Sequence, residues 1–471
     1  MPPELFDNEL IQYKLTETEH ADFVRSLNMN EDETCVEQTP VVFVEGFLGP
    51  GKPAYWGPLE KTFSSSDVEN NKNQKLKNRR CIFVTPGCGS SLYDRAIEIF
   101  YQIKGGRVDY GEEHSKKSGH SRYGREYPGL YPEWSASKPL HFLGHSLGGV
   151  TIWKLQQLLA SDIFPDYLNP HPDMILSLTA VSSPLKGSQS VYLLGATTDP
   201  AGKVRPFSFG AWLGRFVHIY EYLDIKWLKS MTYDFNVDHW NLSFRKNWDF
   251  SSLLPWNIKK ATNTLIEESN ELMQETANSM CLTYGLLQCL YKSPWLNCVD
   301  NAPYDMTIHA MKEANATSKT FEKTFYRTYV TSITYEDHVT KYHYPKFSFS
   351  LPIPIYFLSR FTGSFKFPED TPDPPVSYEE MYKWYENDGI CPKYSQEHPH
   401  HDCSLDKCKH QKGLPEGAAP YKIEAGIWDV WENDNTSHFG LVSVCYESHK
   451  QRLFFRGYKE YLDQIDQLDN R

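Results

Sequence analysis

Residues 141–149 read HFLGHSLGG and are followed by VTIWKLQQLL, so an apolar run, a glycine-flanked serine and a helix-like stretch succeed one another. This order predicts a strand, a sharp turn and a helix, with Ser146 in the turn. Bulky side chains two positions either side of the serine would collide there, and Gly144 and Gly148 occupy those positions. We therefore predict that Ser146 is a nucleophile exposed at the end of a sheet. An ordinary glycine-rich turn is the alternative.

Other apolar runs suggest what surrounds this turn. Strands are expected within TPVVFVEGFLGPG (39–51), RCIFVTPG (80–87) and MILSLTAVSS (174–183), with helix-like segments at 91–103 and 149–160. Strands that alternate with helices indicate an α/β fold, in which helices cover both faces of a parallel sheet. Further strands are expected at 325–334 and 421–431, and a closing helix at 448–466.

The segment 207–223, FSFGAWLGRFVHIYEYL, has apolar side chains on roughly one face of a predicted helix. These are Phe209, Trp212, Leu213, Phe216, Ile219, Tyr220 and Leu223. The pattern fits a helix packed on the core, and it fits equally a mobile lid over a lipid-accepting cleft.

Length and composition exclude several classes of protein. The 471 residues are 40% hydrophobic and 14% aromatic, enough for a large core. We expect one domain over 40–471, preceded by a polar N-terminal extension of uncertain order at 1–39. The formal charge of −12, without a basic stripe, argues against nucleic acid as a partner.

The location is also predicted from the sequence. No apolar run approaches the length of a membrane span, and the first residues lack the pattern of a signal peptide, so neither is expected. Ten cysteines at irregular spacings suit a reduced interior better than a disulfide framework. We therefore expect an intracellular protein, cytoplasmic or peripherally associated with lipid.

An activated serine requires an imidazole base and a carboxylate that orients the imidazole. His438 is the candidate base, because it lies in the polar loop NDNTSHFG after a predicted strand. Asp388 is the candidate acid, in the turn-forming Asn-Asp-Gly of WYENDGI. Asp434 is the alternative acid, although it is close in sequence to His438. The order Ser, Asp, His is the one expected after a strand–turn–helix nucleophile.

The negative oxygen formed when Ser146 attacks an ester requires amide donors. The backbone N–H of Leu147, directly after the nucleophile, is one candidate for this oxyanion hole. The backbone N–H of Phe47, in the glycine-containing loop EGFLG after the first strand, is the other.

Several long motifs resemble one known family. They are GRVDYGEEHSKKSGHSRYGREYPGLYPEW, GHSLGG, TYDFNVDHW, DNAPYDMTIHAM, WYENDGI and GIWDVWENDNTSHFG. In order and spacing, over about residues 40 to 460, they are similar to the staphylococcal and thermoalkalophilic bacillus-type triacylglycerol lipases and their eukaryotic relatives. The resemblance implies an α/β-hydrolase fold with a helical lid at about 190–230, a zinc-tied inserted subdomain, and a triad of Ser146, Asp388 and His438.

The resemblance also implies four zinc ligands, which fall on Asp94, His114, His120 and Asp305. Two carboxylates and two imidazoles would close a tetrahedral shell and leave no open position, so the zinc should be structural. Without the resemblance, Asp94 would be interpreted as a helix-start residue and both histidines as solvated.

The chain departs from the family pattern at several positions. Gly440 and Cys445 stand where the family has calcium-binding carboxylates, so calcium is not expected. Leu147 stands where the family often has glutamine, which leaves the backbone donor intact. Glu45 replaces a histidine before the oxyanion loop, which bears on how Phe47 is held.

An insertion at 398–410, HPHHDCSLDKCKH, concentrates possible ligands for a soft metal. They are His398, His400, His401, Cys403, Cys408 and His410. Their spacing matches no established zinc motif, so a solvated loop is expected and a second metal site is the alternative.

Together these features predict a serine hydrolase that cleaves acylglycerol esters through an acyl-enzyme on Ser146, at a lipid or lipid–water interface. A phospholipase, thioesterase or acyltransferase on the same triad is the alternative within enzymes, because the elbow specifies acyl transfer only. A catalytically silent lipid-binding protein is the alternative outside them. Chain-length preference and oligomeric state do not follow from the sequence.

Overall fold

The computed structural model describes most of the chain, and the expected extension at 1–39 lies almost wholly outside this part. The described residues are 38–51, 54–64, 78–164, 166–167, 169–223, 233–242, 298–347, 352–400, 408–412, 422–442 and 449–469.

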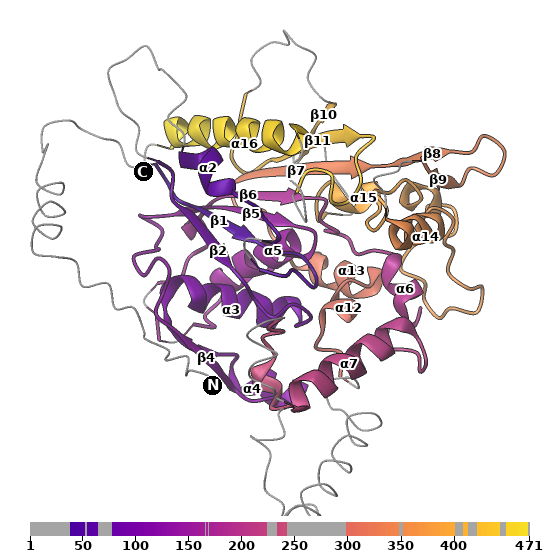
Figure 1. Cartoon of the computed structure of the whole chain (residues 1–471), viewed down its shortest axis with the longest axis horizontal. Coiled ribbons are helices and arrows are strands. Elements are labelled where there is room, and N and C mark those ends of the chain that lie inside the picture. The colour runs from indigo at the N-terminus through magenta and orange to yellow at the C-terminus, as the bar shows by residue number, and fades with distance from the viewer. Residues whose placement is uncertain are drawn as a thin grey trace, which may run out of the picture.

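The described residues form a central seven-stranded sheet in which every pairing is parallel (Figure 1). Across the sheet, the strands are β10 (Cys408–Lys412), β11 (Trp428–Asp434), β7 (Phe325–Ser332), β6 (Ile175–Val181), β5 (Leu140–His145), β1 (Val41–Val44) and β2 (Cys81–Val84). The register places Gly144 beside Val44 and His145 beside Val181. The carboxyl ends of the inner strands therefore meet at one edge, where α/β folds place their sites.

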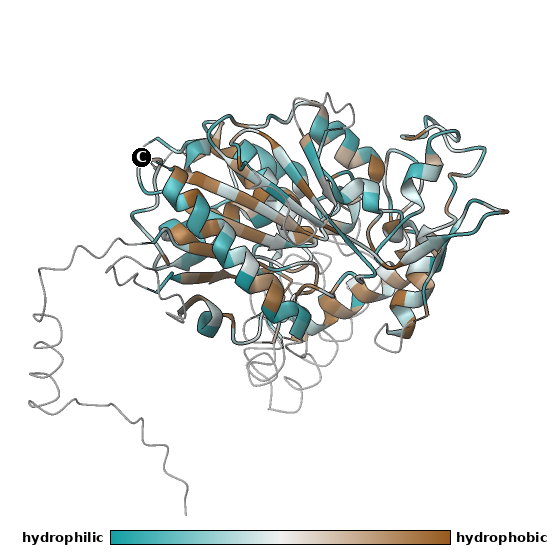
Figure 2. Ribbon diagram, turned by 90° about the horizontal axis from the view of Figure 1, so that it is seen from above, coloured by the Kyte–Doolittle hydropathy of each residue, from teal (hydrophilic) through white to brown (hydrophobic). Residues whose placement is uncertain are grey.

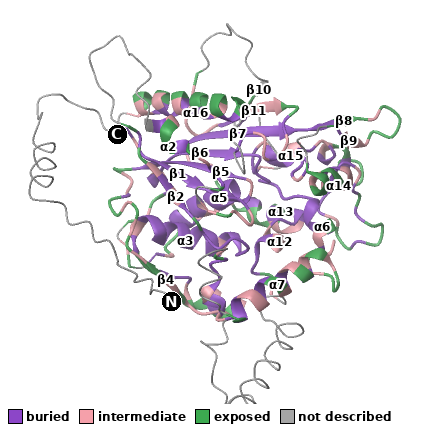
Figure 3. Cartoon of the chain, in the orientation of Figure 1, coloured by how far each residue is buried: buried purple, intermediate pink, exposed green. Residues whose placement is uncertain are grey.

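Helices cover both faces of the sheet. Helices α3 (Leu92–Lys104) and α5 (Leu147–Leu159) pack on one face, while α2 (Leu59–Ser64) and α16 (His449–Leu468) lie on the other (Figure 1). The inner strands β1, β5, β6 and β7 are buried along their whole length because neither face meets water. Hydrophobic residues gather in the sheet in Figure 2, and the buried residues do so in Figure 3. The site is thus built on a rigid, doubly covered sheet.

Polar contacts tie α16 to the sheet. The guanidinium of Arg79 donates to Asp463 at 2.7 Å and to Asp466 at 2.8 Å. His141 of β5, fully buried, lies with Nε2 3.0 Å from Asp466 Oδ1 and Nδ1 2.7 Å from Ser177 Oγ. Buried polar groups of this kind are stable only when they are hydrogen-bonded. These contacts lie at the amino-terminal end of β5, away from Ser146.

The remaining elements are two small sheets and several short helices. Strands β3 (Gly106–Asp109) and β4 (Tyr123–Tyr127) pair antiparallel, and α4 (Glu112–Ser118) lies between them in the chain. A second pair is β8 (Thr334–Glu336) with β9 (His343–Pro345). The other helices are η1 (Pro172–Met174), α6 (Ser190–Leu194), α7 (Phe209–Leu223), η2 (Asp238–Trp240), α12 (Ala302–Asp305), α13 (Ile308–Ala316), α14 (Ile353–Thr362), η4 (Met381–Trp384) and α15 (Lys393–Gln396).

The α/β fold expected from the sequence is confirmed, with one shifted boundary and, in the central sheet, one strand that was not expected. The strand expected at 421–431 is β11, which begins only at Trp428. Gly426, with φ of 76°, makes a turn just before it, and that backbone conformation favours glycine. Edge strand β10 comes from the His/Cys-rich insertion, whose polar sequence CKHQK carries no strand signal.

Candidate active site

Ser146 occupies a strained turn between β5 and α5. Its backbone has φ of 55° and ψ of −126°, outside the region that residues with a side chain normally adopt. A Cβ on Gly144 would lie 2.3 Å from the nitrogen of Gly149, and one on Gly148 would lie 2.2 Å from the carbonyl oxygen of Val44. Both positions therefore require glycine, because neighbouring backbone atoms leave no room for a Cβ. Such a tight turn is expected where a serine is presented at the end of a strand.

Asp388 and His438 meet beside this turn. His438 Nδ1 lies 2.9 Å from Asp388 Oδ2, and the Asp388 side chain is 0% exposed. Thr331 Oγ1 and Gln396 Nε2 also donate to Oδ2, at 2.9 and 3.2 Å. A buried carboxylate with this many donors is held in one orientation.

The other oxygen of Asp388 is also occupied. Oδ1 accepts from the backbone N–H groups of Ile390 and Cys391 at 2.9 and 2.8 Å. The Asn-Asp-Gly turn thus presents the carboxylate while its own backbone fixes it. Asp434, the alternative acid, is 65% exposed and lies 3.7 Å from Lys393 Nζ. The described geometry therefore favours Asp388 as the partner of His438.

The loop after β1 lies next to Ser146. Phe47 and Leu147 line the same cavity as Ser146. Leu147 is the first residue of α5, so its N–H belongs to the helix start, where backbone donors have no intrahelical acceptor. The two amides chosen from the sequence thus belong to residues at the mouth of this cavity. Their role as an oxyanion hole stays a prediction.

Glu45 makes hydrogen bonds that brace the loop that carries Phe47. Its Oε2 accepts from the backbone N–H of Gly51 at 2.9 Å, and its backbone carbonyl accepts from Arg95 at 2.7 Å. Burial raises the pKa of this carboxyl to about 7, although the Gly51 amide and the Arg95 charge oppose the shift. Glu45 is therefore a structural part of the loop that carries Phe47.

Helix α7 covers a second, apolar cavity. Leu213 and Val217 of α7 face this cavity, together with Phe47, which also lines the Ser146 cavity. The outward side of α7 is apolar as well, since Trp212 is 58% and Phe216 is 59% exposed. A helix that is apolar on both sides suits an element that covers a cavity and contacts a lipid surface.

Possible metal ligands lie close together at the start of α3. His114 Nε2 lies 2.9 Å from Asp94 Oδ1 and 3.2 Å from Asp300 Oδ2, while His120 Nε2 lies 3.2 Å from Asp300 Oδ2. The cluster is thus Asp94, His114, His120 and Asp300, and the expected ligand Asp305 is not part of it. Asp305 instead accepts from the backbone N–H of Leu92 at 2.6 Å, at the start of α3.

The chemistry of this cluster fits a divalent cation. Asp94 Oδ2, His120 Nε2 and Asp300 Oδ2 are buried and converge on one point, with His120 Nε2 3.7 Å from Asp94 Oδ2 and 3.2 Å from Asp300 Oδ2. Burial lowers the pKa of His114, but its bonds to Asp300 and Asp94 outweigh this effect and raise the pKa to about 9. The carboxylates thus attract a positive charge into the site, which protons or a metal can supply.

Sequence reasoning missed His239, which also lies at this cluster. Its Nε2 is 3.2 Å from Asp94 Oδ2, and its Nδ1 is 3.1 Å from the hydroxyl of Tyr110. Tyr110 in turn donates to Glu98 at 2.7 Å. The signal available in the sequence was the motif TYDFNVDHW, in which His239 directly follows Asp238.

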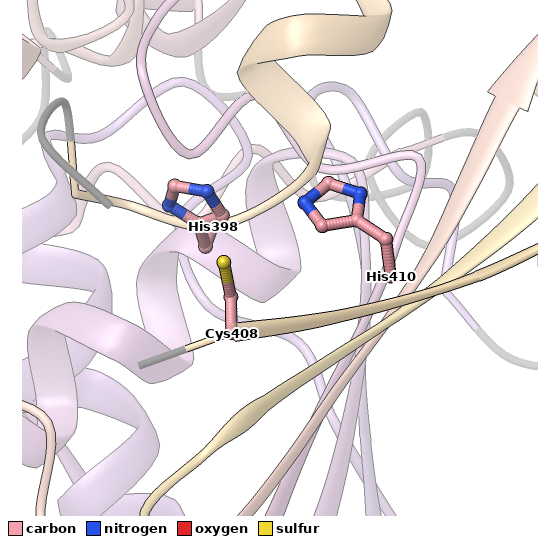
Figure 4. A group of neighbouring side chains, drawn as sticks. All are labelled: His398, Cys408 and His410. Atoms are coloured by element: carbon pink, nitrogen blue, oxygen red, sulfur yellow. The ribbon is translucent and has the colours of Figure 1, made fainter. Parts of the chain in front are cut away.

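The His/Cys-rich insertion brings three possible ligands together, His398, Cys408 and His410 (Figure 4). Cys408, however, is disulfide-bonded, and a disulfide sulfur is not the thiolate that binds a soft metal. His400 points elsewhere, with Nε2 2.7 Å from Thr320 Oγ1, and His401 and Cys403 lie outside the described residues. Since His398 is buried, the expectation of a wholly solvated loop is wrong at this position.

Two other expectations concern the surroundings of the site. Of the two positions that bear on calcium, Gly440 is described and carries no ligand side chain, and Cys445 lies outside the described part. None of the described helices has both the length and the apolar composition that crossing a bilayer requires.

The sheet, the elbow serine and the buried Asp388–His438 pair define an α/β-hydrolase fold. Within that class, residues 37–247 match the family model "Lipase-like, C-terminal domain". The chain is 25% identical to a Staphylococcus epidermidis lipase over 474 aligned positions, covering 93% of this chain and 57% of the relative. It is 28% identical to Lipase 2 of Staphylococcus aureus over 451 positions, covering 91% and 53%. The resemblance to staphylococcal lipases is confirmed.

Solved structures support the same fold. Staphylococcus hyicus lipase superposes with a TM-score of 0.63 at 21% identity, over 94% of this chain and 99% of that one. EstA of Clostridium botulinum superposes with a TM-score of 0.59 at 23% identity, over 93% and 90%. The chain spans little more than half the length of the curated relatives it matches, 53 to 57%.

The expected intracellular location is contradicted. The staphylococcal lipases among the relatives are secreted, extracellular enzymes. The disulfide at Cys408 also departs from the reduced interior that the cysteine spacing suggested.

Proposed function

We propose that this chain is a serine hydrolase of carboxylic esters, with acylglycerols as substrates. The observation that carries the proposal is the buried Asp388–His438 pair, 2.9 Å apart, next to a strained serine that lines an apolar cavity. A catalytic base needs a carboxylate that orients it, and this pair lies beside the serine that the base would serve.

In the proposed reaction, Ser146 Oγ attacks the ester carbonyl while His438 Nε2 takes the hydroxyl proton. Asp388 keeps the His438 proton on Nδ1 and stabilises the imidazolium that forms. The backbone N–H groups of Phe47 and Leu147 stabilise the oxyanion. His438 then protonates the departing alcohol, and water, deprotonated by His438, releases the fatty acid from Ser146.

We propose that Asp94, His114, His120 and Asp300 hold a structural zinc ion. Two carboxylates and two imidazoles neutralise the dication and close its coordination shell. When bound, zinc would tie the α4 segment between β3 and β4 to the start of α3. The metal takes no part in the chemical steps at Ser146.

The region 190–230, as far as it is described, serves as the lid in this proposal. Helix α7 separates an apolar cavity from an exposed aromatic surface, as an element that admits long acyl chains would. The rest of the expected lid, residues 224–230, lies outside the described part of the chain.

The test is covalent labelling with a fluorophosphonate, followed by assays on matched triglyceride, phospholipid and thioester substrates. Wild type should be labelled and Ser146→Ala should not, with triglyceride hydrolysed fastest. Absence of labelling would instead support a silent lipid-binding protein. Faster turnover of phospholipid or thioester would indicate a phospholipase or a thioesterase that uses the same proposed triad.

A further inference from the structure

His145, the residue before the nucleophile, connects two parts of the site that are far apart in the sequence. Its Nε2 lies 2.8 Å from the backbone carbonyl oxygen of His438, and its Nδ1 is in close contact with the hydroxyl of Tyr55. That hydroxyl also accepts from the backbone N–H of Gly46 at 3.0 Å. His145 and Tyr55 are both buried. A single imidazole therefore joins the loop of the base to the loop that carries Phe47.

The hydrogen atoms in this chain can be assigned from its chemistry. The Tyr55 oxygen accepts from Gly46, so its own hydrogen is free to be donated to His145 Nδ1. Because Nδ1 accepts, the ring hydrogen of neutral His145 lies on Nε2, which donates to the carbonyl of His438. Burial holds the pKa of His145 well below its usual range, so the ring stays neutral. Every donor then meets an acceptor.

The consequence for His438 is that its backbone is held from both sides. Its N–H donates to the carbonyl of Asp388 at 2.9 Å, and its carbonyl accepts from His145 at 2.8 Å. Its Nδ1 is occupied by Asp388 Oδ2. Of the polar groups of His438, this leaves Nε2, the atom that must reach Ser146.

We propose that His145 is a positioning residue that couples the oxyanion loop to the catalytic base. This inference rests on the proposed function of Ser146 and His438. Displacing His145 shifts the carbonyl of His438 and releases Tyr55 from its contact, so both the base and the amide of Phe47 lose their alignment. Misplacement of reacting groups by about 1 Å can cost about 10²-fold in rate.

The expected result for His145→Ala is a kcat about 10²-fold lower on a soluble short-chain ester, with KM changed less than about twofold. His145→Gln, whose amide N–H can reach the carbonyl of His438, should recover about tenfold of that loss. Tyr55→Phe should slow wild type but have little further effect in the His145→Ala background, since the chain of hydrogen bonds is already broken.

His141 provides a matched control. It is a fully buried histidine of the same strand, β5, four residues earlier, and its partners are Ser177 and Asp466. His141→Gln should lower the thermal unfolding midpoint without a selective loss of kcat. A change in kcat of less than twofold in His145→Ala would refute the coupling. So would a double variant in which the fold-losses of His145→Ala and Tyr55→Phe multiply as independent effects.

A second readout does not depend on activity. The imidazole nitrogen resonances of wild type should show His145 as the neutral Nε2–H tautomer, and Tyr55→Phe should shift the ring resonances of His438 as well as those of His145. If wild type fails to react with the fluorophosphonate, the proposed function fails, and the NMR result still decides the coupling. An unchanged His438 spectrum in Tyr55→Phe would overturn it.

Discussion

Asp388 contacts His438 twice, through the side chains at 2.9 Å and through the backbone, where the Asp388 carbonyl accepts from the His438 N–H, also at 2.9 Å. The acid therefore fixes both the ring and the main chain of the proposed base. An exposed carboxylate such as that of Asp434 makes neither contact in the described structure.

Asp388→Asn should keep the backbone contact but favour the wrong tautomer of His438, because an amide can donate to Nδ1. We expect kcat to fall by about 10²–10⁴-fold on a soluble ester. Asp434→Asn serves as the control and should retain wild-type kcat. Comparable losses in both variants would remove the assignment of Asp388.

The fourth metal position distinguishes two aspartates five residues apart. Asp300→Asn should sharply lower the zinc content measured by elemental analysis after gel filtration, because Asp300 Oδ2 lies 3.2 Å from both His114 and His120. Asp305→Asn should leave the zinc content intact, since Asp305 serves the start of α3. The reverse pattern would restore the expectation from the sequence.

Glu45 should make the free energy of unfolding depend on pH. Its pKa is raised by burial from 4.5 to about 7 in the folded state. Folding therefore binds a proton between these two pH values. The contribution of Glu45 to the free energy of unfolding is fully present below pH 4.5 and is lost as pH rises toward 7. The loss is of order ~3 kcal/mol.

Glu45→Gln, which can still accept from Gly51, should remove this part of the slope in denaturant titrations between pH 4.5 and 7. Glu336→Gln is the control, because Glu336 is exposed and the hydrogen bond from Lys341 lowers its pKa. Parallel stability profiles for wild type and Glu45→Gln would show that Glu45 is already ionised in the fold.

The outward aromatic side of α7 should act only at an interface. Trp212→Ser and Phe216→Ser should each weaken adsorption to a triglyceride emulsion about tenfold, because each removes apolar area that enters the lipid. Hydrolysis of a soluble ester should change little. Val339→Ser, at a 90% exposed position in the β8–β9 turn, should behave as wild type in both assays. Equal losses on both substrates would assign α7 a structural role instead.

The sheet and its central helices could be predicted from the sequence because their signals are local. The apolar runs of β1, β2, β5, β6 and β7 and the periodic helices beside them lie where expected, within a few residues. Edge strand β10 could not be found in this way, because its residues CKHQK are polar and pair with β11 only in the folded chain. Polar edge strands depend on tertiary context.

The site was predictable to the extent that its residues stand in recognisable motifs. Ser146 follows from glycine spacing, and Asp388 and His438 follow from chain order and turn chemistry. The choice between Asp300 and Asp305 depends on which carboxylate folds toward His114 and His120, and the motif contains both. The contact of Tyr55 with His145 joins residues 90 apart and leaves no local pattern.

The double fixation of His438 also bears on how a lipid surface would switch the protein on. A histidine whose main chain is held on both sides does not need to be assembled when α7 moves. Interfacial activation would then change only the access of an acyl chain to the site, because the proposed catalytic groups are already in place. Small water-borne esters would gain little from an added interface.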